Sequence, residues 1–150
     1  PDAWIVLKAI YEKFCPRELF FSGYGIREGI IFCQFSNEIK KLDPLLQACL
    51  YLEKNRSRYS GFGKILFEWL LPIFPKIDNK QKKIFLAACY LHDTFWQAHP
   101  DYRSEVCFET VTGANLGGID HSGRIFLALS LMSRYKKTDL NKIDKKYLLL

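Results

Sequence analysis

The sequence predicts a mainly α-helical protein that begins with one short α/β unit. From about residue 36 to the end of the chain, apolar residues recur at helical spacing in segments separated by polar joints. Only one segment, Glu18–Ser22, has the short, aromatic and apolar composition of a buried strand. With 150 residues, of which 49% are apolar and 25% charged, the chain has the size and balance of one ordinary globular domain.

The first 35 residues predict a helix–strand–helix unit. A helix is expected over Asp2–Phe14, with its first residue as the cap. Cys15-Pro16 ends this helix, because the residue before a proline is pushed out of the helical region. The strand Glu18–Ser22 follows, then a turn at Gly23–Gly25 and a second helix over Ile26–Phe35.

Both ends of the sequence predict a piece of a longer protein. The first residue is Pro1 rather than methionine, and the chain ends on Leu148–Leu150 without a polar tail. A single strand cannot form a sheet by itself. We therefore expect the partners of the strand to lie outside this chain.

Residues 36–150 predict an all-α body. A charged linker, Asn37–Asp43, is expected to precede it. Asp43-Pro44 then places a capping residue before a proline at the first helical position, which favours a helix start. A basic loop, Asn55–Gly63, follows the first helix. Six helices are expected, over 43–54, 64–74, 78–92, 102–114, 120–135 and 139–150.

The net charge favours an anionic partner. Lysine and arginine number 22 against 16 acidic residues, which gives a formal charge of +6. Phosphate polymers, nucleotides, RNA and acidic proteins all fit this charge, and so does a plain surplus of surface lysine. The chain carries no recognisable nucleic-acid motif, so nucleic acid is not expected as the partner.

The cysteines indicate a reducing compartment. Their number, five, is odd, and they are widely spaced without a CxxC pair. Most lie among apolar neighbours, where a reduced cysteine acts as a small apolar residue. We expect a cytoplasmic protein without a structural disulfide or zinc site. No apolar stretch approaches the roughly 18 residues needed to cross a bilayer, so no membrane association is expected.

His92-Asp93, at the end of an apolar helix, is typical of metal-dependent phosphohydrolases of the HD type. In that signature an upstream histidine and a downstream aspartate complete a site for one or two metal ions, which activate water. The other histidines, His99 and His121, both follow His92, so the first ligand is missing. The alternative is a structural pair that forms hydrogen bonds at a helix end.

Gly118–Arg124 leads from a loop into a helix and is a candidate anion site. Free backbone N–H groups at a helix start favour a phosphate, and Arg124 can add a two-pronged contact. The alternative is a plain helix start that is capped by Asp120 or Ser122.

Two further segments offer an arginine to an anion. The polar and aromatic loop Trp96–Arg103 can place Arg103 at the wall of a pocket, or it can be a packed turn in which Asp101 caps the next helix. The turn Gly23–Gly25 allows close approach of the backbone and brings Arg27 to a helix start.

Taken in order, these segments resemble one family of hydrolases, the bacterial exopolyphosphatase / guanosine pentaphosphate phosphohydrolase family. The resemblance spans nearly the whole chain. Its segments are Ser22–Gly29 (SGYGIREG), Leu66–Phe74, Ala87–Asp93, Ala98–Arg103 and Gly118–Leu129.

The resemblance implies a domain organisation. Members carry two actin-like α/β domains followed by a helical domain that is related to HD phosphohydrolases. Residues 1–35 would be the tail of the second actin-like domain. Residues 36–150 would be the HD-like helical domain, incomplete at its C-terminus. The phosphate-binding loops and the catalytic carboxylate of the family lie in the actin-like domains, so this chain is not expected to hydrolyse its substrate alone.

The resemblance also implies site residues. Arg27, Arg103 and Arg124 fall in matching segments and are the candidates for phosphate contact, with Arg58 and Lys64 as second candidates. Phe62 stands where many relatives have a histidine. His92, Asp93 and Asp120 would therefore form a degenerate HD site that holds no metal, while magnesium serves the complete enzyme.

Three functions remain open at this point. The leading one is a substrate-holding and assembly region of an enzyme that acts on polyphosphate or guanosine pentaphosphate and forms a homodimer. The second is an interaction module that mediates dimerisation without a ligand. The third is an HD-type metal phosphohydrolase, which the missing histidine disfavours.

Overall fold

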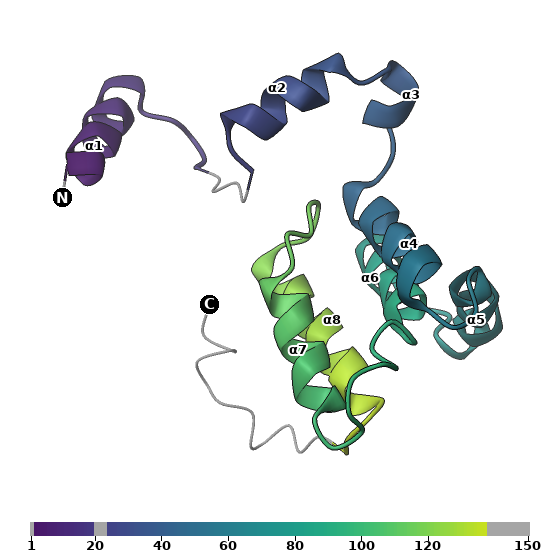
Figure 1. The fold of residues 1–150 in the computed structure, drawn as a ribbon. Helices are drawn as coiled ribbons and strands as arrows, with labels where there is room; N and C mark the ends of the chain where they lie inside the picture. The colour runs from purple at the N-terminus through teal and green to yellow at the C-terminus, as the bar shows by residue number, and fades with distance from the viewer. Residues whose placement is uncertain (1, 20–23, 138–150) are drawn as a thin grey trace. The chain divides into compact units, whose positions relative to one another are not determined.

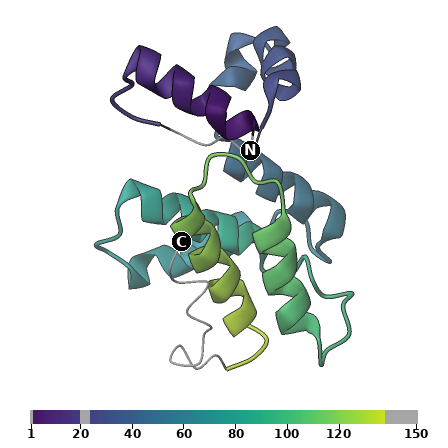
Figure 2. The same cartoon turned by 90° about the vertical axis from the view of Figure 1, so that its left-hand side faces the viewer.

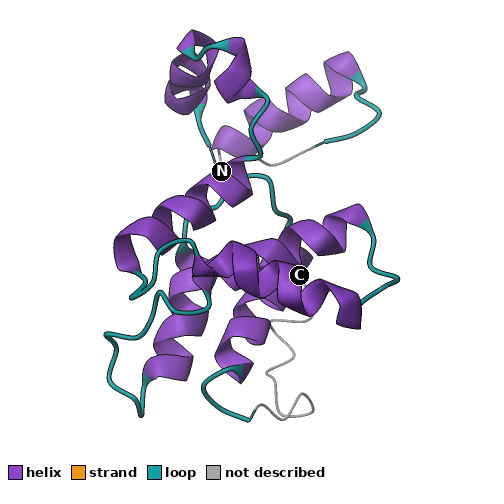
Figure 3. Cartoon of the chain, turned by 90° about the vertical axis from the view of Figure 1, so that its right-hand side faces the viewer, coloured by secondary structure: helices purple, strands orange, loops and turns teal. Residues whose placement is uncertain are grey.

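The computed structural model describes residues 2–19 and 24–137 (Figure 1). Every regular element in these ranges is a helix, as Figure 3 shows, so the prediction of a mainly helical protein is confirmed. None of the described helices has the length and apolar character needed to cross a membrane. The elements are α1 (Asp2–Phe14), α2 (Ile26–Gln34), α3 (Asn37–Lys40), α4 (Pro44–Arg56), α5 (Phe62–Leu70), the 3-10 turn η1 (Leu71–Ile73), α6 (Asn79–Leu91), α7 (Arg103–Gly113) and α8 (His121–Ser133).

Two predicted elements are not tested. Of the strand Glu18–Ser22, the first two residues have no regular structure, and residues 20–22 lie outside the described residues. The final helix, 139–150, also lies outside them. The strand, the last helix and the HD-like assignment therefore stay predictions.

The internal contacts divide the chain into two compact units, Pro1–Phe35 and Ser36–Leu150. The first unit contains α1 and α2, and neither helix has a buried residue. Large apolar side chains such as Trp4 and Ile26 are 68% and 83% exposed. The assignment of this unit to an actin-like domain stays a prediction.

α6 is the central helix of the second unit. It contacts α4, α5 and α8, and α7 packs along α8 (Figure 2). Burial raises the pKa of the Cys49 and Cys107 thiols to about 12, so both stay protonated and pack as small apolar groups. The buried apolar cluster consists of Leu45, Cys49, Ile84, Ala87, Leu91, Phe95, Cys107, Val111, Leu116, Leu127, Ala128 and Leu131.

Acidic caps begin α4 and α8, two of the helices that line the core. Asp43 Oδ1 accepts a hydrogen bond from Leu46 N–H at 3.1 Å, which starts α4 as predicted. At α8, Asp120 Oδ1 accepts from Gly123 N–H at 2.8 Å. Ser122 instead donates its hydroxyl hydrogen to the same carboxylate at 3.1 Å. Of the two predicted caps for this helix, Asp120 is therefore the one that acts.

The prediction of a linker over Asn37–Asp43 is wrong for its first four residues, Asn37–Lys40, which form the helix α3. Ser36 Oγ accepts a hydrogen bond from Ile39 N–H at 3.5 Å and caps the one-turn helix α3. Local capping by a serine is enough to start a helical turn in a segment whose charge suggests a loop.

Two further boundaries differ from the prediction. α5 begins at Phe62, two residues early, because Gly61 takes the left-handed conformation with φ of 86° and turns the loop into the helix. Asp101 does not cap α7, since the residue at that cap is Tyr102, which makes no side-chain cap bond.

Candidate functional site

A cavity of about 450 Å³ surrounds the His92-Asp93 pair. It is built where the loop after α4, the start of α5, the end of α6 and the end of α8 meet. Two guanidinium groups, one carboxylate and three aromatic rings face it. The lining residues are Arg58, Tyr59, Phe62, His92, Asp93 and Arg134.

Asp93 is bound to Arg58 by three hydrogen bonds, and Asp93 is only 4% exposed. The backbone N–H and Nε of Arg58 each donate to Oδ2 at 3.1 Å, and Nη2 donates to Oδ1 at 2.6 Å. The side-chain bond from Arg58 is the main reason that the pKa of Asp93 lies below its usual range. Arg58 therefore neutralises the carboxylate of Asp93. The Nη1 group of Arg58 takes no part in this pair.

His92 is fixed at one ring nitrogen. Nδ1 lies 2.8 Å from the carbonyl oxygen of Cys89, which can only accept, so Nδ1 donates in this bond. The ring of Phe62 packs against the imidazole with 5.5 Å between the centroids. Phe62 thus lies beside His92 at the place where the resemblance implies the missing upstream ligand.

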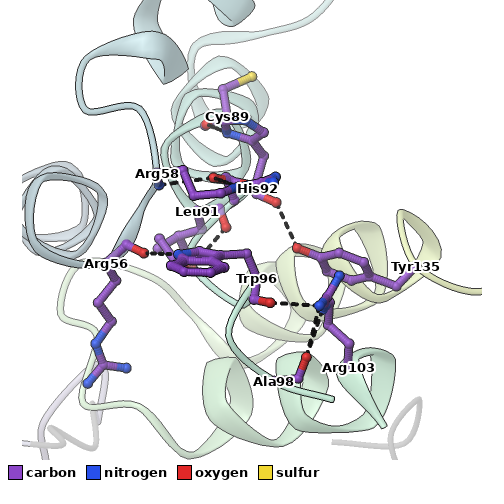
Figure 4. Close-up of polar contacts among 11 residues, drawn as sticks. Arg56, Arg58, Cys89, Leu91, His92, Trp96, Ala98, Arg103 and Tyr135 are labelled. Atoms are coloured by element: carbon purple, nitrogen blue, oxygen red, sulfur yellow. Dashed lines mark hydrogen bonds and ion pairs between the residues drawn. The ribbon is translucent and has the colours of Figure 1, made fainter. Parts of the chain in front are cut away.

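Hydrogen bonds to backbone carbonyls hold the segment that follows His92 (Figure 4). Trp96 Nε1 donates to the carbonyl of Arg56 at 3.0 Å, and the hydroxyl of Tyr135 donates to the carbonyl of His92 at 3.0 Å. The guanidinium of Arg103 donates to Trp96 O at 2.6 Å and to Ala98 O at 2.9 and 3.1 Å. In this structure Arg103 is therefore bonded to the loop, and its contact with a phosphate stays a prediction.

Arg124 makes a similar set of bonds at the end of α7. Its Nη2 donates to Leu116 O at 2.8 Å, and Nη1 donates to the carbonyls of Val111 and Ala114. These bonds satisfy carbonyls that the end of the helix leaves without a helical partner. Arg27 lies exposed in the first turn of α2, within the first unit. Phosphate contact by these two arginines also stays a prediction.

Asp120 lies away from the His92-Asp93 pair. Its Oδ2 accepts from Lys80 Nζ at 2.7 Å, and this bond is the main cause that lowers the pKa of Asp120 to about 2. Lys80 is in the first turn of α6, whereas Asp93 follows the end of that helix, about 20 Å further along. The three residues that the resemblance groups in one site are therefore at opposite ends of α6.

The described side chains do not fit a catalytic metal at this cavity. Within residues 2–19 and 24–137, no group of three or more His, Cys, Asp and Glu side chains could hold one ion. Both oxygens of Asp93 already accept hydrogen bonds from Arg58. We therefore derive no reaction step through a metal held by these residues.

Two residues that line the cavity, Tyr59 and Arg134, were not singled out in the sequence, and neither was the buried Glu53, which does not line it. Arg134 directly follows α8 and lines the cavity. In the sequence it stands at the end of an apolar helix, where an arginine is usually exposed to solvent. Glu53 lies within α4 and is fully buried, and its Oε1 accepts a hydrogen bond from Gly63 N–H at 2.6 Å. The only available signal for Glu53 was a charged residue among the apolar positions of a helix.

We expect the Arg58–Asp93 pair to make stability depend on pH. The pKa of Asp93 is lower in the folded protein than its value of about 3.9 in the unfolded chain. The pair therefore stabilises the fold fully at a pH above about 3.9, and this stabilisation is lost as the pH falls through the pKa of the folded protein. Urea unfolding between pH 6 and about pH 2 measures this dependence. An Asp93→Asn variant should lose stability less steeply with acid than the wild type. Equal slopes would contradict the role of the pair.

The sequence was compared with known proteins. Residues 45–150 match the family described as "Exopolyphosphatase, C-terminal". The match includes α4 from its second residue, α5 to α8, and every residue of the cavity. No curated protein matched the chain.

Proposed function

Because this chain belongs to the exopolyphosphatase family through its C-terminal domain, we propose that its second unit holds the polyanionic substrate. The substrate would be polyphosphate or guanosine pentaphosphate, from which the complete enzyme removes a terminal phosphate. The chain would not catalyse this hydrolysis alone, and it would work as part of a cytoplasmic homodimer. Magnesium would be required by the complete enzyme.

The observation that supports this proposal is the charge balance of the 450 Å³ cavity. Arg58 and Arg134 face it, and the one carboxylate, Asp93, is paired with Arg58, so these three side chains carry a net positive charge. Guanidinium groups bind phosphate oxygens through two parallel hydrogen bonds. Because the side chain of Arg58 is 52% exposed, it can bind a phosphate while it remains bonded to Asp93.

The same contacts favour binding over catalysis. Asp93 is poorly suited to act as a general base, because hydrogen bonds from Arg58 occupy both of its oxygens. Phosphoryl transfer depends on the positioning of a nucleophile and on the neutralisation of charge. The cavity offers groups for the second task.

The test is a titration of the chain with long-chain polyphosphate at two salt concentrations, together with an assay of released phosphate in the presence of magnesium. We expect binding that weakens as salt rises, because bound cations release counterions from a polyanion. We expect no release of phosphate. No binding at low salt would overturn the proposal. Release that an Asp93→Asn variant abolishes would restore the HD-type hydrolase.

A second function is supported by α1 and α2, neither of which has a buried residue. Exposed apolar helices are typical of interaction surfaces. The chain would then be an interaction module without a ligand. In that case polyphosphate would not bind, and the concentration dependence of the molecular mass would reveal association.

A further inference from the structure

A second cavity, of about 440 Å³, lies between α5, α6 and α8. One face of α6 lines it from Gln81 to the end of the helix. Its other walls come from α5, from the turn after α5, and from α8. Its lining is mainly apolar. The lining residues are Leu66, Leu70, Phe74, Ile77, Gln81, Ile84, Phe85, Ala88, Cys89, His92, Phe126, Ser130, Leu131 and Arg134.

The two cavities of the second unit share His92 and Arg134. Along α6 the apolar cavity extends from Gln81 to His92, which corresponds to about 17 Å of helix. One end of the apolar cavity therefore adjoins the cationic cavity that contains Arg58.

The length of the cavity and the positive charge at one end favour an apolar chain with an anionic head group as the occupant. One acyl chain of a bilayer leaflet is about 15 Å long, since two of them span the hydrocarbon core. The length of the cavity thus matches one extended apolar chain.

We propose that this cavity binds an amphiphile that has one apolar chain and a phosphate-type head group. The chain lies along α6, against Phe85 and Phe126. The head group lies at the shared rim, where Arg134 and Arg58 contact it. The contact of the head group rests on the proposed phosphate binding by the cationic cavity, whereas the chain contact does not.

Calorimetry of the 150-residue chain with dodecyl phosphate, below the concentration at which it forms micelles, tests this inference. Inorganic phosphate and dodecanol are the two comparison probes. We expect dodecyl phosphate to bind with a stoichiometry of one and about 100-fold more tightly than inorganic phosphate, because its chain is removed from water. Arg134→Gln should weaken the binding of dodecyl phosphate and leave the binding of dodecanol unchanged.

Two serines of α8 provide a matched pair of variants. Ser130 and Ser133 are both exposed, and each donates its hydroxyl hydrogen to the carbonyl four residues earlier. Ser130 lines the cavity, and Ser133 does not. Ser130→Trp should block the place of the alkyl chain and weaken the binding of dodecyl phosphate about tenfold or more. Ser133→Trp should leave this binding unchanged.

The outcomes separate this inference from the proposed function. Binding of dodecyl phosphate no tighter than that of inorganic phosphate would overturn the inference, and so would equal effects of the two tryptophan variants. Polyphosphate should bind Ser130→Trp as it binds the wild type. Failure of the wild type to bind polyphosphate would instead overturn the proposed function.

Discussion

Replacement of Gly63 by alanine is expected to lower the free energy of unfolding by about 2–3 kcal/mol. Gly63 is buried where α5 meets α6. A Cβ at this position would lie 2.7 Å from the carbonyl oxygen of Cys89 and 2.8 Å from Cα of Tyr90. Both are backbone atoms of α6, so they cannot rotate away as a side chain could. Urea unfolding followed by circular dichroism measures the loss.

Gly113→Ala is the matched control for this prediction. Gly113 is also helical, and a Cβ there would meet nothing within 4 Å. Since alanine is the better helix former, this variant should be unchanged or up to about 1 kcal/mol more stable. Equal destabilisation by both alanines would show that the close approach of α5 and α6 is not what matters.

Replacement of Glu53 by alanine is expected to destabilise the protein by about 3 kcal/mol. The carboxylate is fully buried and accepts the backbone N–H of Gly63 in the first turn of α5. Truncation would leave that donor buried without a partner and would open a cavity beside it. The measurement is again urea unfolding.

Glu53→Gln separates hydrogen bonding from charge. The amide oxygen of glutamine can accept the same hydrogen bond, so this variant should stay within about 1 kcal/mol of the wild type. Among the described residues Oε2 of Glu53 has no hydrogen-bond partner, so the bond to Oε1 is the contact at stake. A glutamine variant as unstable as the alanine variant would contradict this account and would assign the effect to the charge.

Much of the helical fold could be predicted because its signals are local. Asp43-Pro44 and Asp120 begin helices through contacts within three residues, and such contacts can be read from the sequence. The errors are also local. Ser36 starts a helical turn inside a charged segment, and Gly61 moves the start of α5 by two residues through its positive φ.

The site could be predicted only in part because its contacts are distant in sequence. Arg58, Phe62, His92 and Asp93 were each singled out, but the pairing of Arg58 with Asp93 joins residues 35 positions apart. Arg124 lies at a helix start that looks equally suited to a phosphate or to backbone carbonyls. In the structure its guanidinium is bonded to carbonyls at the end of α7, and no local pattern could have distinguished these cases.

The central claim is that the cavity beside His92 binds a polyanion through its arginines. The salt dependence of polyphosphate binding to an Arg134→Gln variant tests it most directly, with Lys82→Gln, an exposed lysine outside the cavity, as the control. We predict weaker binding and a salt slope reduced by about one for Arg134→Gln, and a smaller change for Lys82→Gln. Equal effects of the two variants would show that polyphosphate binds the overall positive charge of the chain and would contradict a binding site in this cavity.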